Sequence, residues 1–400
     1  MALRYSDFVD YSKLDPVKRM ALEIFEPTLI YPERLGIRVV PQTLGETAVG
    51  FDFRGVRSSW IKRLGNLLLL KSDTDFILTS NVEGLGTKNR IADAIYALVF
   101  LEKKSVADQM AVRRLYRGLG QDTVAMSVND QLSIGADVFA YNDIISCGNS
   151  NWFSNDMERI RELLMGYREA ADAGQFAIPQ GETPELRDVV NPDTLDLAGS
   201  SVGLIKPSSR LVTGEAIQVG DVIYGLESSG IHANGLTKAR RLADKLPEGY
   251  FTDLGNGQAL GEALLVPTRL YSRPVMSMFD AGADIHYLQP ITGHGWEKIA
   301  RAKQPLTYAI ERVPQPPLLF QKLIEWGAQN GFDVSSGENY FTWNMGIGYV
   351  VIAPEKDVET IRRVADQHGV KAHRLGYVHK GKRQVLMPFS ESGKQVVYTP

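Results

Sequence analysis

Five residues of the run VEGLGTK combine the chemical groups that bind a phosphate: Glu83, Gly84, Gly86, Thr87 and Lys88. The two glycines let the backbone bend closely and direct its N–H groups at a ligand, and a following helix would turn its positive end toward the same turn. The ammonium of Lys88 and the hydroxyl of Thr87 suit phosphate oxygens, and the carboxylate of Glu83 suits a metal ion. The run is not a Walker A loop, whose glycines are spaced differently. The alternative is a glycine-rich turn that only caps a helix.

Three further polar residues, Asp122, Asn129 and Asp130, fall in a segment of helical pattern. Asp122 and Asn129 are seven residues apart and share a face, while Asp130 lies about 100° further round. Oxygen ligands of this kind suit Mg²⁺, which takes one or two carboxylates together with waters and nucleotide phosphates. The neighbours are apolar, so burying Asp130 without a cation or strong donors would be costly. The alternative for Asp122 is a residue at the N-terminus of the helix.

Two loops later in the chain also carry polar groups beside glycines. Gly181, Glu182 and Thr183 follow an expected strand, where the carboxylate could reach a nucleotide or a metal, or could belong to a surface turn. The second loop follows the strand pattern DVIYGL and precedes a helix, as anion sites do. Its only titratable group near neutrality is a histidine, which could equally be structural. The residues of this second loop that we expect at the substrate are Ser228, Ser229, Gly230, His232 and Asn234.

A third loop contains Thr292 and Gly293 in the sequence PITGHGW and would allow a ligand to approach closely. The run NMGIG at 344–348 is better explained by tight strand packing. The single cysteine, Cys147, lies in a buried-looking segment, and we expect a small core residue rather than a nucleophile.

The elements that must position these residues alternate between strand and helix patterns, which predicts a mixed α/β or α+β protein of two domains. We expect an N-terminal extension over 1–45, an N-terminal domain over 46–206 and a C-terminal domain over 207–400. The expected strands are 75–82, 138–146, 175–179, 198–205, 221–226 and 345–353. The expected helices are 89–103, 123–134, 156–173, 235–242, 263–279 and 358–368.

Composition excludes several classes of protein. The 400 residues carry 44 basic and 47 acidic side chains, and a net charge of −3 gives no footprint for nucleic acid or an anionic membrane. One cysteine excludes an intramolecular disulfide and a cysteine zinc cluster. The chain contains no apolar run long enough to span a bilayer, and its first residues lack the apolar stretch of a signal peptide. We therefore expect a cytoplasmic protein.

In order and spacing, these motifs resemble the aminoimidazole ribonucleotide synthetase family, the phosphoribosylformylglycinamidine cyclo-ligases of purine biosynthesis. VEGLGTK resembles the family's Asp-Gly-Val-Gly-Thr-Lys, and VAMSVNDQLSIG resembles its Val-Asn-Asp helix. Gly181-Glu182-Thr183 resembles its Gly-Gly-Glu-Thr. GDVIYGLESSGIHANG, LLVPTRLY and NMGIG are similar over their whole lengths. The resemblance spans roughly residues 80–350.

The resemblance implies a PurM-like fold, in which the N-terminal domains of a homodimer pair into a β-barrel with flanking helices and an α/β C-terminal domain follows. It also implies Mg²⁺ and ATP as cofactors and a small-molecule substrate. The family phosphorylates the formyl amide oxygen of formylglycinamidine ribonucleotide, after which the amidine nitrogen closes the imidazole ring and expels phosphate. Such catalysis rests on positioning and charge neutralisation.

Carried over by position, the resemblance gives each candidate residue a role. Lys88, Asp130 and His232 become candidate catalytic residues, His232 as an acid, a base or a phosphate contact. The remaining assignments follow as sets. The candidate metal ligands are Glu83, Asp122 and Asp130. The candidate nucleotide contacts are Glu83, Gly84, Gly86, Thr87, Lys88, Asn129, Gly181, Glu182 and Thr183. The candidate substrate contacts are Ser228, Ser229, Gly230, His232, Asn234, Thr292 and Gly293.

The chain departs from the family pattern mainly on the substrate side. The family's aspartate is Glu83 here, and its His-Leu/Ile-Thr-Gly-Gly-Gly is replaced by a run that starts at Pro290 and places a histidine at His294. Phe341 stands where the family has arginine, and the family's glycine cluster near the N-terminus has no good counterpart. These departures leave open a paralogue that uses ATP on a different acceptor.

The superfamily also includes selenophosphate synthetase, thiamine monophosphate kinase and a hydrogenase-maturation protein. The absence of Cys or Sec near the N-terminus disfavours the first of these. A non-catalytic binding protein with the same fold is a further alternative, disfavoured because Gly84, Gly86, Lys88 and Asp130 are retained.

Overall fold

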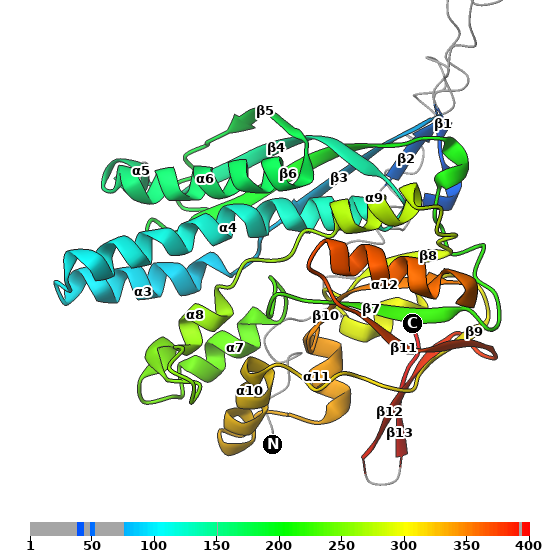
Figure 1. Cartoon of the computed structure of the whole chain (residues 1–400). Helices are drawn as coiled ribbons and strands as arrows, with labels where there is room; N and C mark the ends of the chain where they lie inside the picture. Colours follow the sequence, from blue (N-terminus) through cyan, green and yellow to red (C-terminus); the bar gives the residue numbers. More distant parts are fainter. Residues whose placement is uncertain (1–37, 44–48, 53–75, 150, 392–393) are drawn as a thin grey trace, which may run out of the picture.

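The computed structural model describes residues 38–43, 49–52, 76–149, 151–391 and 394–400. Two sheets, each with its own helices, lie one above the other in Figure 1 and confirm the predicted mixed α/β architecture of two domains. Most of the expected N-terminal extension lies outside the described residues. Its end, β1 (Arg38–Val39), pairs with β2 (Val49–Asp52) in the N-terminal sheet, so this part belongs to the domain that we expected to begin at residue 46.

The N-terminal sheet has the strand order β1-β2-β3-β6-β4-β5. All described pairs are antiparallel except β4 and β5. The remaining strands of this sheet are β3 (Ile77–Gly84), β4 (Asp137–Cys147), β5 (Ala177–Glu182) and β6 (Leu195–Ile205). Its helices are α3 (Asn89–Leu101), α4 (Val106–Leu132), α5 (Asn151–Ser154) and α6 (Met157–Gly174).

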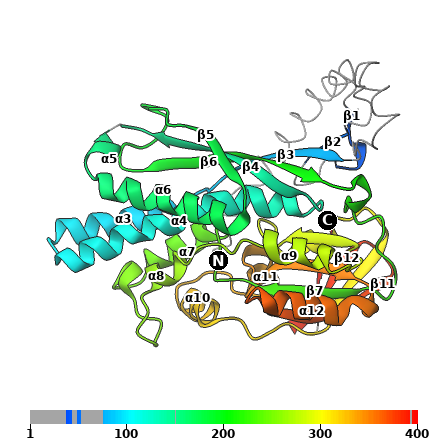
Figure 2. The same cartoon turned by 45° about the horizontal axis from the view of Figure 1, so that its top comes forward.

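The N-terminal helices cover one face of this sheet, as Figures 1 and 2 show. Alternation along β6 follows from that arrangement, because every second residue from Leu195 to Ile205 is buried and the residues between them are not. Cys147 at the end of β4 is fully buried, which confirms the prediction of a core residue.

The C-terminal sheet has the order β13-β12-β9-β11-β7-β10-β8. Its strands are β7 (Val222–Glu227), β8 (Tyr287–Pro290), β9 (Leu306–Ile310), β10 (Ile347–Ala353), β11 (Ala372–Lys380), β12 (Gln384–Glu391) and β13 (Lys394–Tyr398). Its helices are α7 (Leu236–Ala243), α8 (Leu260–Leu264), α9 (Ser272–Asp280), α10 (Leu318–Gln329), α11 (Ser336–Thr342) and α12 (Val358–Gln367). Every residue of β10 is buried, as expected for a central strand covered on both faces. No helix in the described part of the chain is long and apolar enough to cross a membrane.

Helix α4 is much longer than the 123–134 helix that the pattern predicts. Ser105 and Asp108 form a capping box at its start, which satisfies the first free N–H groups. Two glycines inside it explain both the missed pattern and the packing. A Cβ at Gly120 would lie 2.4 Å from the Leu163 oxygen of α6, and one at Gly118 would lie 3.0 Å from Pro267. The helix is therefore built to be packed closely on two sides.

The prediction of a helix over 263–279 is wrong in its middle. Helix α8 ends at Leu264 and α9 begins at Ser272, and residues 265–271 between them run without helix or strand. We call these residues the junction segment, because they belong to the C-terminal domain but lie against α4. Pro267 cannot continue a helix, and the segment's backbone groups are bonded instead by side chains of the N-terminal domain.

Candidate active site at the domain junction

Lys88 and Asp122 form a buried ion pair beneath the junction segment. The Lys88 Nζ lies 2.8 Å from each Asp122 carboxylate oxygen, and both side chains are completely buried. Nζ also donates to the Val266 carbonyl at 2.7 Å. On its other side Asp122 Oδ1 accepts the backbone N–H of Thr268 at 2.7 Å and also its hydroxyl. Burial lowers the pKa of Lys88 and raises that of Asp122, and the ion pair opposes both shifts.

This placement departs from the expected roles of both residues. A phosphate contact for Lys88 or a metal contact for Asp122 requires a side chain that a ligand can reach, and here both are enclosed and engaged with the junction segment. The loss of hydration explains why they need each other, because a lone charge at this depth costs several kcal/mol. We call Lys88 and Asp122 the sealed pair. Their predicted contacts to nucleotide and metal stay predictions, and they require this pair to open.

Asn129 joins the same segment two turns along α4. Its Nδ2 donates to the Arg269 carbonyl at 2.8 Å, and its Oδ1 accepts the N–H of Tyr271 at 2.9 Å. The amide thus pairs with an extended backbone as a neighbouring strand would. Gln121 adds a bond from Nε2 to the Thr268 carbonyl at 2.8 Å. The shared helix face expected for Asp122 and Asn129 is present, and it faces protein backbone.

Asp130 points away from the junction segment, as the helical spacing implies, and meets Glu83 at the end of β3. The two carboxyl groups share a hydrogen bond. Asp130 is buried with 7% of its surface exposed, and burial raises its pKa. Lys298, Glu83 and Arg301 oppose that rise. Because Lys298 lies in the 3₁₀ helix Gly295–Arg301 of the C-terminal domain, this group of charges spans the two domains.

Lys298 is a residue that sequence reasoning missed. Its side chain is buried with 7% exposed, and Nζ donates to the Thr292 hydroxyl. Thr292 belongs to the loop predicted to contact the substrate. We call Glu83, Asp130, Thr292 and Lys298 the junction cluster. No local pattern in the sequence could have paired Lys298 with Asp130, because their neighbourhood arises only when the two domains meet.

The glycine-rich turn above Glu83 is open to solvent. Gly84, Gly86 and Thr87 are exposed, and a Cβ on Gly86 would meet nothing within 4 Å. Gly86 has φ +78°, a left-handed conformation that glycine adopts without strain. The expected turn between strand and helix is present, since β3 ends at Gly84 and α3 begins at Asn89. Leu85 and the last residue of the turn, Lys88, are buried.

Gly181 and Glu182 lie at the far edge of the same sheet. Glu83, Gly199, Asp143 and Gly181 follow one another in register across β3, β6, β4 and β5. Three strand spacings, about 14 Å in all, separate Gly181 from Glu83. Gly181, Glu182 and Thr183 are exposed. Within one chain the structure therefore does not bring them into contact with the junction cluster.

His232 is buried, with 3% exposed, and adopts φ +62°. Its Nε2 accepts the N–H of Ser229 at 3.3 Å. Burial, with the positive charges of Lys88 and Arg269, lowers its pKa to about 3. A histidine of this kind is neutral near pH 7, which departs from the expected role as an acid and leaves the neutral ring as an acceptor.

The hydroxyl residues beside His232 hold two loops together. Ser228 Oγ donates to Asn344 Oδ1 at 3.1 Å, and Ser229 Oγ donates to the Pro267 carbonyl at 2.5 Å. Asn344 Nδ2 donates to the Gly230 carbonyl at 2.8 Å. The NMGIG run therefore packs against this loop, in line with its structural interpretation. Nδ2 of Asn234 is buried without a hydrogen-bond partner among the described residues.

On the substrate side, the departures from the family pattern contact one another. His294 and Phe341 pack edge to face with ring centroids 5.8 Å apart. His294 adopts φ +69° just before Gly295, and a Cβ on Gly295 would lie 2.1 Å from the Tyr340 oxygen. Thr292 and Gly293, before His294, are half-buried. The histidine and the aromatic residue thus form a packed unit beside the junction cluster.

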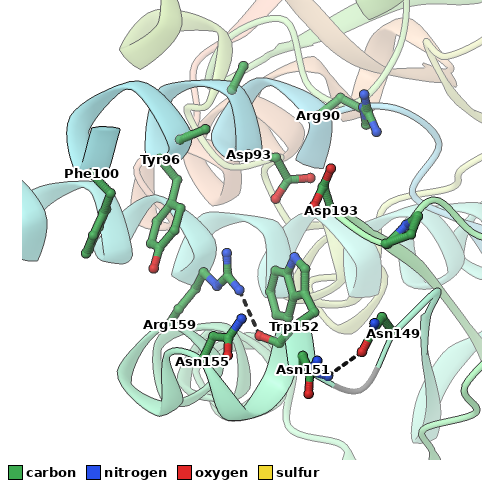
Figure 3. A pocket seen from close by; sticks show the side chains of 13 residues that line it. Arg90, Asp93, Tyr96, Phe100, Asn149, Asn151, Trp152, Asn155, Arg159 and Asp193 are labelled. Atoms are coloured by element: carbon green, nitrogen blue, oxygen red, sulfur yellow. Dashed lines mark hydrogen bonds between the residues drawn. The ribbon is translucent and has the colours of Figure 1, made fainter. Parts of the chain in front are cut away.

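A separate pocket of about 690 Å³ lies between α3 and the start of α6 (Figure 3). The Arg159 guanidinium stacks 3.5 Å from the Trp152 ring centre and donates to the Trp152 carbonyl at 2.8 Å. Asp93 accepts the Tyr116 hydroxyl at 2.7 Å and also that of Thr194. Asp93 is thus held by neighbouring hydroxyls and Arg159 by the Trp152 ring and carbonyl. The sequence motifs of the expected phosphate site lie at the junction cluster instead, which is the stronger candidate site.

The domain arrangement is shared with known proteins. Solved structures of the hydrogenase maturation protein HypE match this fold, one in complex with ATP at a TM-score of 0.52, with 21% identity over 70% of this chain and 78% of that one. A HypE–HypF complex matches at a TM-score of 0.52 with 14% identity over 82% and 96% of the two chains. At these identities the likeness establishes the fold alone.

The family is established by sequence. The models of the AIR synthase related proteins match on either side of the domain boundary, the N-terminal domain at residues 97–205 and the C-terminal domain at 218–387. The chain belongs to this family. Phosphoribosylformylglycinamidine cyclo-ligase of Methanocaldococcus jannaschii is 32% identical over 76% of this chain and 79% of its own. The enzyme of the same name from Caldicellulosiruptor bescii is 32% identical over 82% and 89%.

Proposed function

We propose that this protein is an ATP-dependent phosphoribosylformylglycinamidine cyclo-ligase. It would convert formylglycinamidine ribonucleotide into aminoimidazole ribonucleotide. The observation that carries the proposal is the junction cluster beneath an exposed glycine-rich turn, in a chain that matches cyclo-ligases over more than three quarters of its length.

The exposed end of the turn offers the backbone N–H groups of Gly86 and Thr87 and the Thr87 hydroxyl for the phosphates of ATP. The residues fit one Mg²⁺ held by Glu83 and Asp130 together with phosphate oxygens and waters, since that ion commonly takes one or two carboxylates. No group of three or more acidic, histidine or cysteine side chains that could hold a metal occurs among the described residues. Asp122 does not fit this set because Lys88 and Thr268 engage it. When bound, the ion would neutralise phosphate charge.

The proposed reaction requires that the formyl amide oxygen first be converted into a good leaving group. The formyl amide oxygen attacks the γ-phosphorus of ATP, and the bond to ADP breaks. The amidine nitrogen then attacks the activated carbon, loses a proton and expels inorganic phosphate as the ring closes. An amide oxygen leaves poorly and phosphate leaves well. The chain's part is to orient the two substrates and to match charge, with the substrate expected beside Thr292 and the Ser228–Asn234 loop.

A second function is favoured by one specific observation. Pro290 and Phe341 stand where the family pattern has a histidine and an arginine, so two donors that could hold a phosphate or an amide are absent. His294 packs on Phe341 instead. Each lost charged hydrogen bond costs about 1.5–3 kcal/mol, or about ten- to a hundredfold in binding. The second candidate function is therefore a kinase or ligase that uses ATP in the same way on a different acceptor.

One assay separates these functions. ADP release is measured with formylglycinamidine ribonucleotide, with water alone and with the Asp130→Asn variant, beside a growth test in a purine-auxotrophic host that lacks the cyclo-ligase. Full turnover and rescue support the cyclo-ligase. ATP binding without substrate-dependent ADP release supports the altered acceptor, and neither binding nor turnover contradicts both.

We also propose a homodimer. The face of the N-terminal sheet opposite the helices carries exposed apolar side chains, among them Val82 with 67% and Phe139 with 49% of their surfaces exposed. No described helix or strand covers this face (Figure 2). Light scattering should give about twice 44.3 kDa at micromolar concentration, and Val82→Lys together with Phe139→Lys should give the monomer. A monomeric wild-type protein would contradict the dimer.

A further inference from the structure

Lys88, the lysine of the expected phosphate motif, is bonded to protein groups rather than exposed to a ligand. Lys88 is fully buried, with its ammonium between Asp122 and the Val266 carbonyl at 2.8 and 2.7 Å. Phosphoryl transfer places negative charge on the transferred group and its oxygens, and a positioned cation stabilises that charge. Lys88 as placed here does not supply that charge, so a protein cation acting beside the proposed Mg²⁺ has to come from another residue.

Lys298 is placed to be that cation. It belongs to the 3₁₀ helix Gly295–Arg301 of the C-terminal domain, and its backbone carbonyl accepts the Tyr287 hydroxyl at 3.5 Å. Its ammonium donates to the Thr292 hydroxyl, in the loop expected at the substrate. The backbone of Lys298 and its ammonium group are thus each held by a hydrogen bond within the C-terminal domain, without a bound ligand.

Electrostatics links Lys298 to the nucleotide side of the site. Its charge acts on Asp130 across the domain junction, and Asp130 is hydrogen-bonded to Glu83 beneath the open turn. A buried ammonium loses several kcal/mol of hydration and is retained where an anion compensates it. Lys298 is therefore bonded to the residue expected at the acceptor, and its charge acts on a residue expected at the metal.

We propose that Lys298 contacts the phosphoryl group that passes from ATP to the acceptor oxygen. This rests on the proposed ATP-dependent function, but not on the identity of the acceptor. In the ground state the ammonium bonds an oxygen of the γ-phosphate. It stays with that oxygen as the bond to ADP breaks and the bond to the acceptor forms, and it gives up no proton.

The test compares nucleotides with and without the γ-phosphate. In Lys298→Met we expect the affinity for the magnesium complex of a non-hydrolysable ATP analogue to fall about tenfold, and the affinity for Mg·ADP to stay within about twofold. With a working acceptor, kcat should fall about 10²–10³-fold while KM for the acceptor changes little. Calorimetry and an ADP assay measure these quantities.

A matched control is available in the same domain. Lys238 is also buried, with 1% exposed against 7% for Lys298. Its ammonium lies 2.7 Å from the Asp333 carbonyl, 3.5 Å from Glu338 and 4.7 Å from the Trp343 ring centre, and none of these partners belongs to the junction cluster. Lys238→Met should lower thermal stability and leave the ratio of the two nucleotide affinities unchanged. If Lys298→Met does not fold, Lys298→Gln serves in the same comparison.

Two results would overturn the proposal. One is an equal loss of affinity for the ATP analogue and for ADP, which would assign Lys298 to domain packing. The other is an unchanged preference for the ATP analogue. Failure of the proposed cyclo-ligase function can be distinguished from failure of the Lys298 proposal. In that case the wild-type protein would release no ADP with formylglycinamidine ribonucleotide, while the affinities for the two nucleotides could still be compared.

Discussion

The sealed pair and the N-terminal half of the junction cluster, Glu83 and Asp130, come from the same two regions of the chain and behave in opposite ways. Lys88 follows the turn that begins at Glu83, and Asp122 precedes Asp130 on α4. Yet Lys88 and Asp122 are fully enclosed and bonded to the junction segment. Glu83 and Asp130 instead lie beneath the exposed turn, and the charge of Lys298 acts on Asp130. The sequence predicts one phosphate and metal site from these four residues. In the structure, Lys88 and Asp122 join the two domains, and Glu83 and Asp130 are the pair that a metal or nucleotide could bind.

The largest effect is expected for Lys88→Met, which tests whether the sealed pair stabilises the fold. It leaves the Asp122 carboxylate buried without its cation, which should reduce the free energy of unfolding by about 3–5 kcal/mol. The double variant Lys88→Met with Asp122→Leu removes both charges and should recover much of that loss. Urea unfolding measures both. If the single variant is as stable as the wild type, the pair is not sealed in solution.

The same double variant also separates stability from ligand binding. If Lys88 only joins the domains, a stable double variant keeps its affinity for Mg·ATP within about threefold. A stable double variant that loses that affinity would show that the pair opens and that Lys88 reaches the phosphates, as the motif alone predicts.

The matching change in the junction cluster is Asp130→Asn. The substitution is nearly isosteric, so we expect the melting temperature to change by a few degrees at most. Turnover should fall about a hundredfold or more, because the site loses a charge that organises the metal and the phosphates. An ADP assay beside a thermal melt checks both expectations. A large loss of stability with little loss of activity would reverse the assigned roles of the two groups.

The smallest expected effect concerns pH and His232, which lies beside the sealed pair. Its pKa falls from the ordinary value of 6.5 to about 3 in the fold. Below about pH 6.5, His232 is protonated in the unfolded chain but stays neutral in the folded protein. The free energy of unfolding therefore falls as the pH drops below about 6.5. Between pH 7 and pH 5 this amounts to about 2 kcal/mol.

The variant His232→Asn removes that titration and tolerates φ +62°, because Asn adopts left-handed conformations readily. Its unfolding free energy should depend less on pH than that of the wild type, by about that 2 kcal/mol. Parallel pH dependences for the two proteins would show that His232 is protonated in the folded state as well.

Much of the fold was accessible from sequence because local pattern and tertiary burial agree there. Strand β3, helix α3, strand β4 and helix α6 lie within a few residues of their predicted positions. Each has one covered face, and its periodicity records that face. The first half of α4 was missed because its glycines and charges serve packing against two neighbours rather than one apolar face.

The site was accessible only in part, and for a physical reason. The glycine-rich turn and the direction of Asp130 follow from local geometry. Whether Lys88 faces solvent depends on a carbonyl at Val266, and the cation beside Asp130 comes from Lys298. The wrong helix over 265–271 has the same origin, since the backbone there is bonded by Asp122 and Asn129 of the other domain. Contacts between distant segments leave no periodic trace.

The junction segment has a consequence for how the chain folds and is synthesised. A stretch of C-terminal backbone takes its hydrogen bonds from the long helix of the N-terminal half, so neither half can satisfy its own polar groups alone. The two sheets should melt in one cooperative transition, and either half expressed separately should be poorly soluble. Gene fragments divided near residue 210 should yield stable protein only when both are produced together.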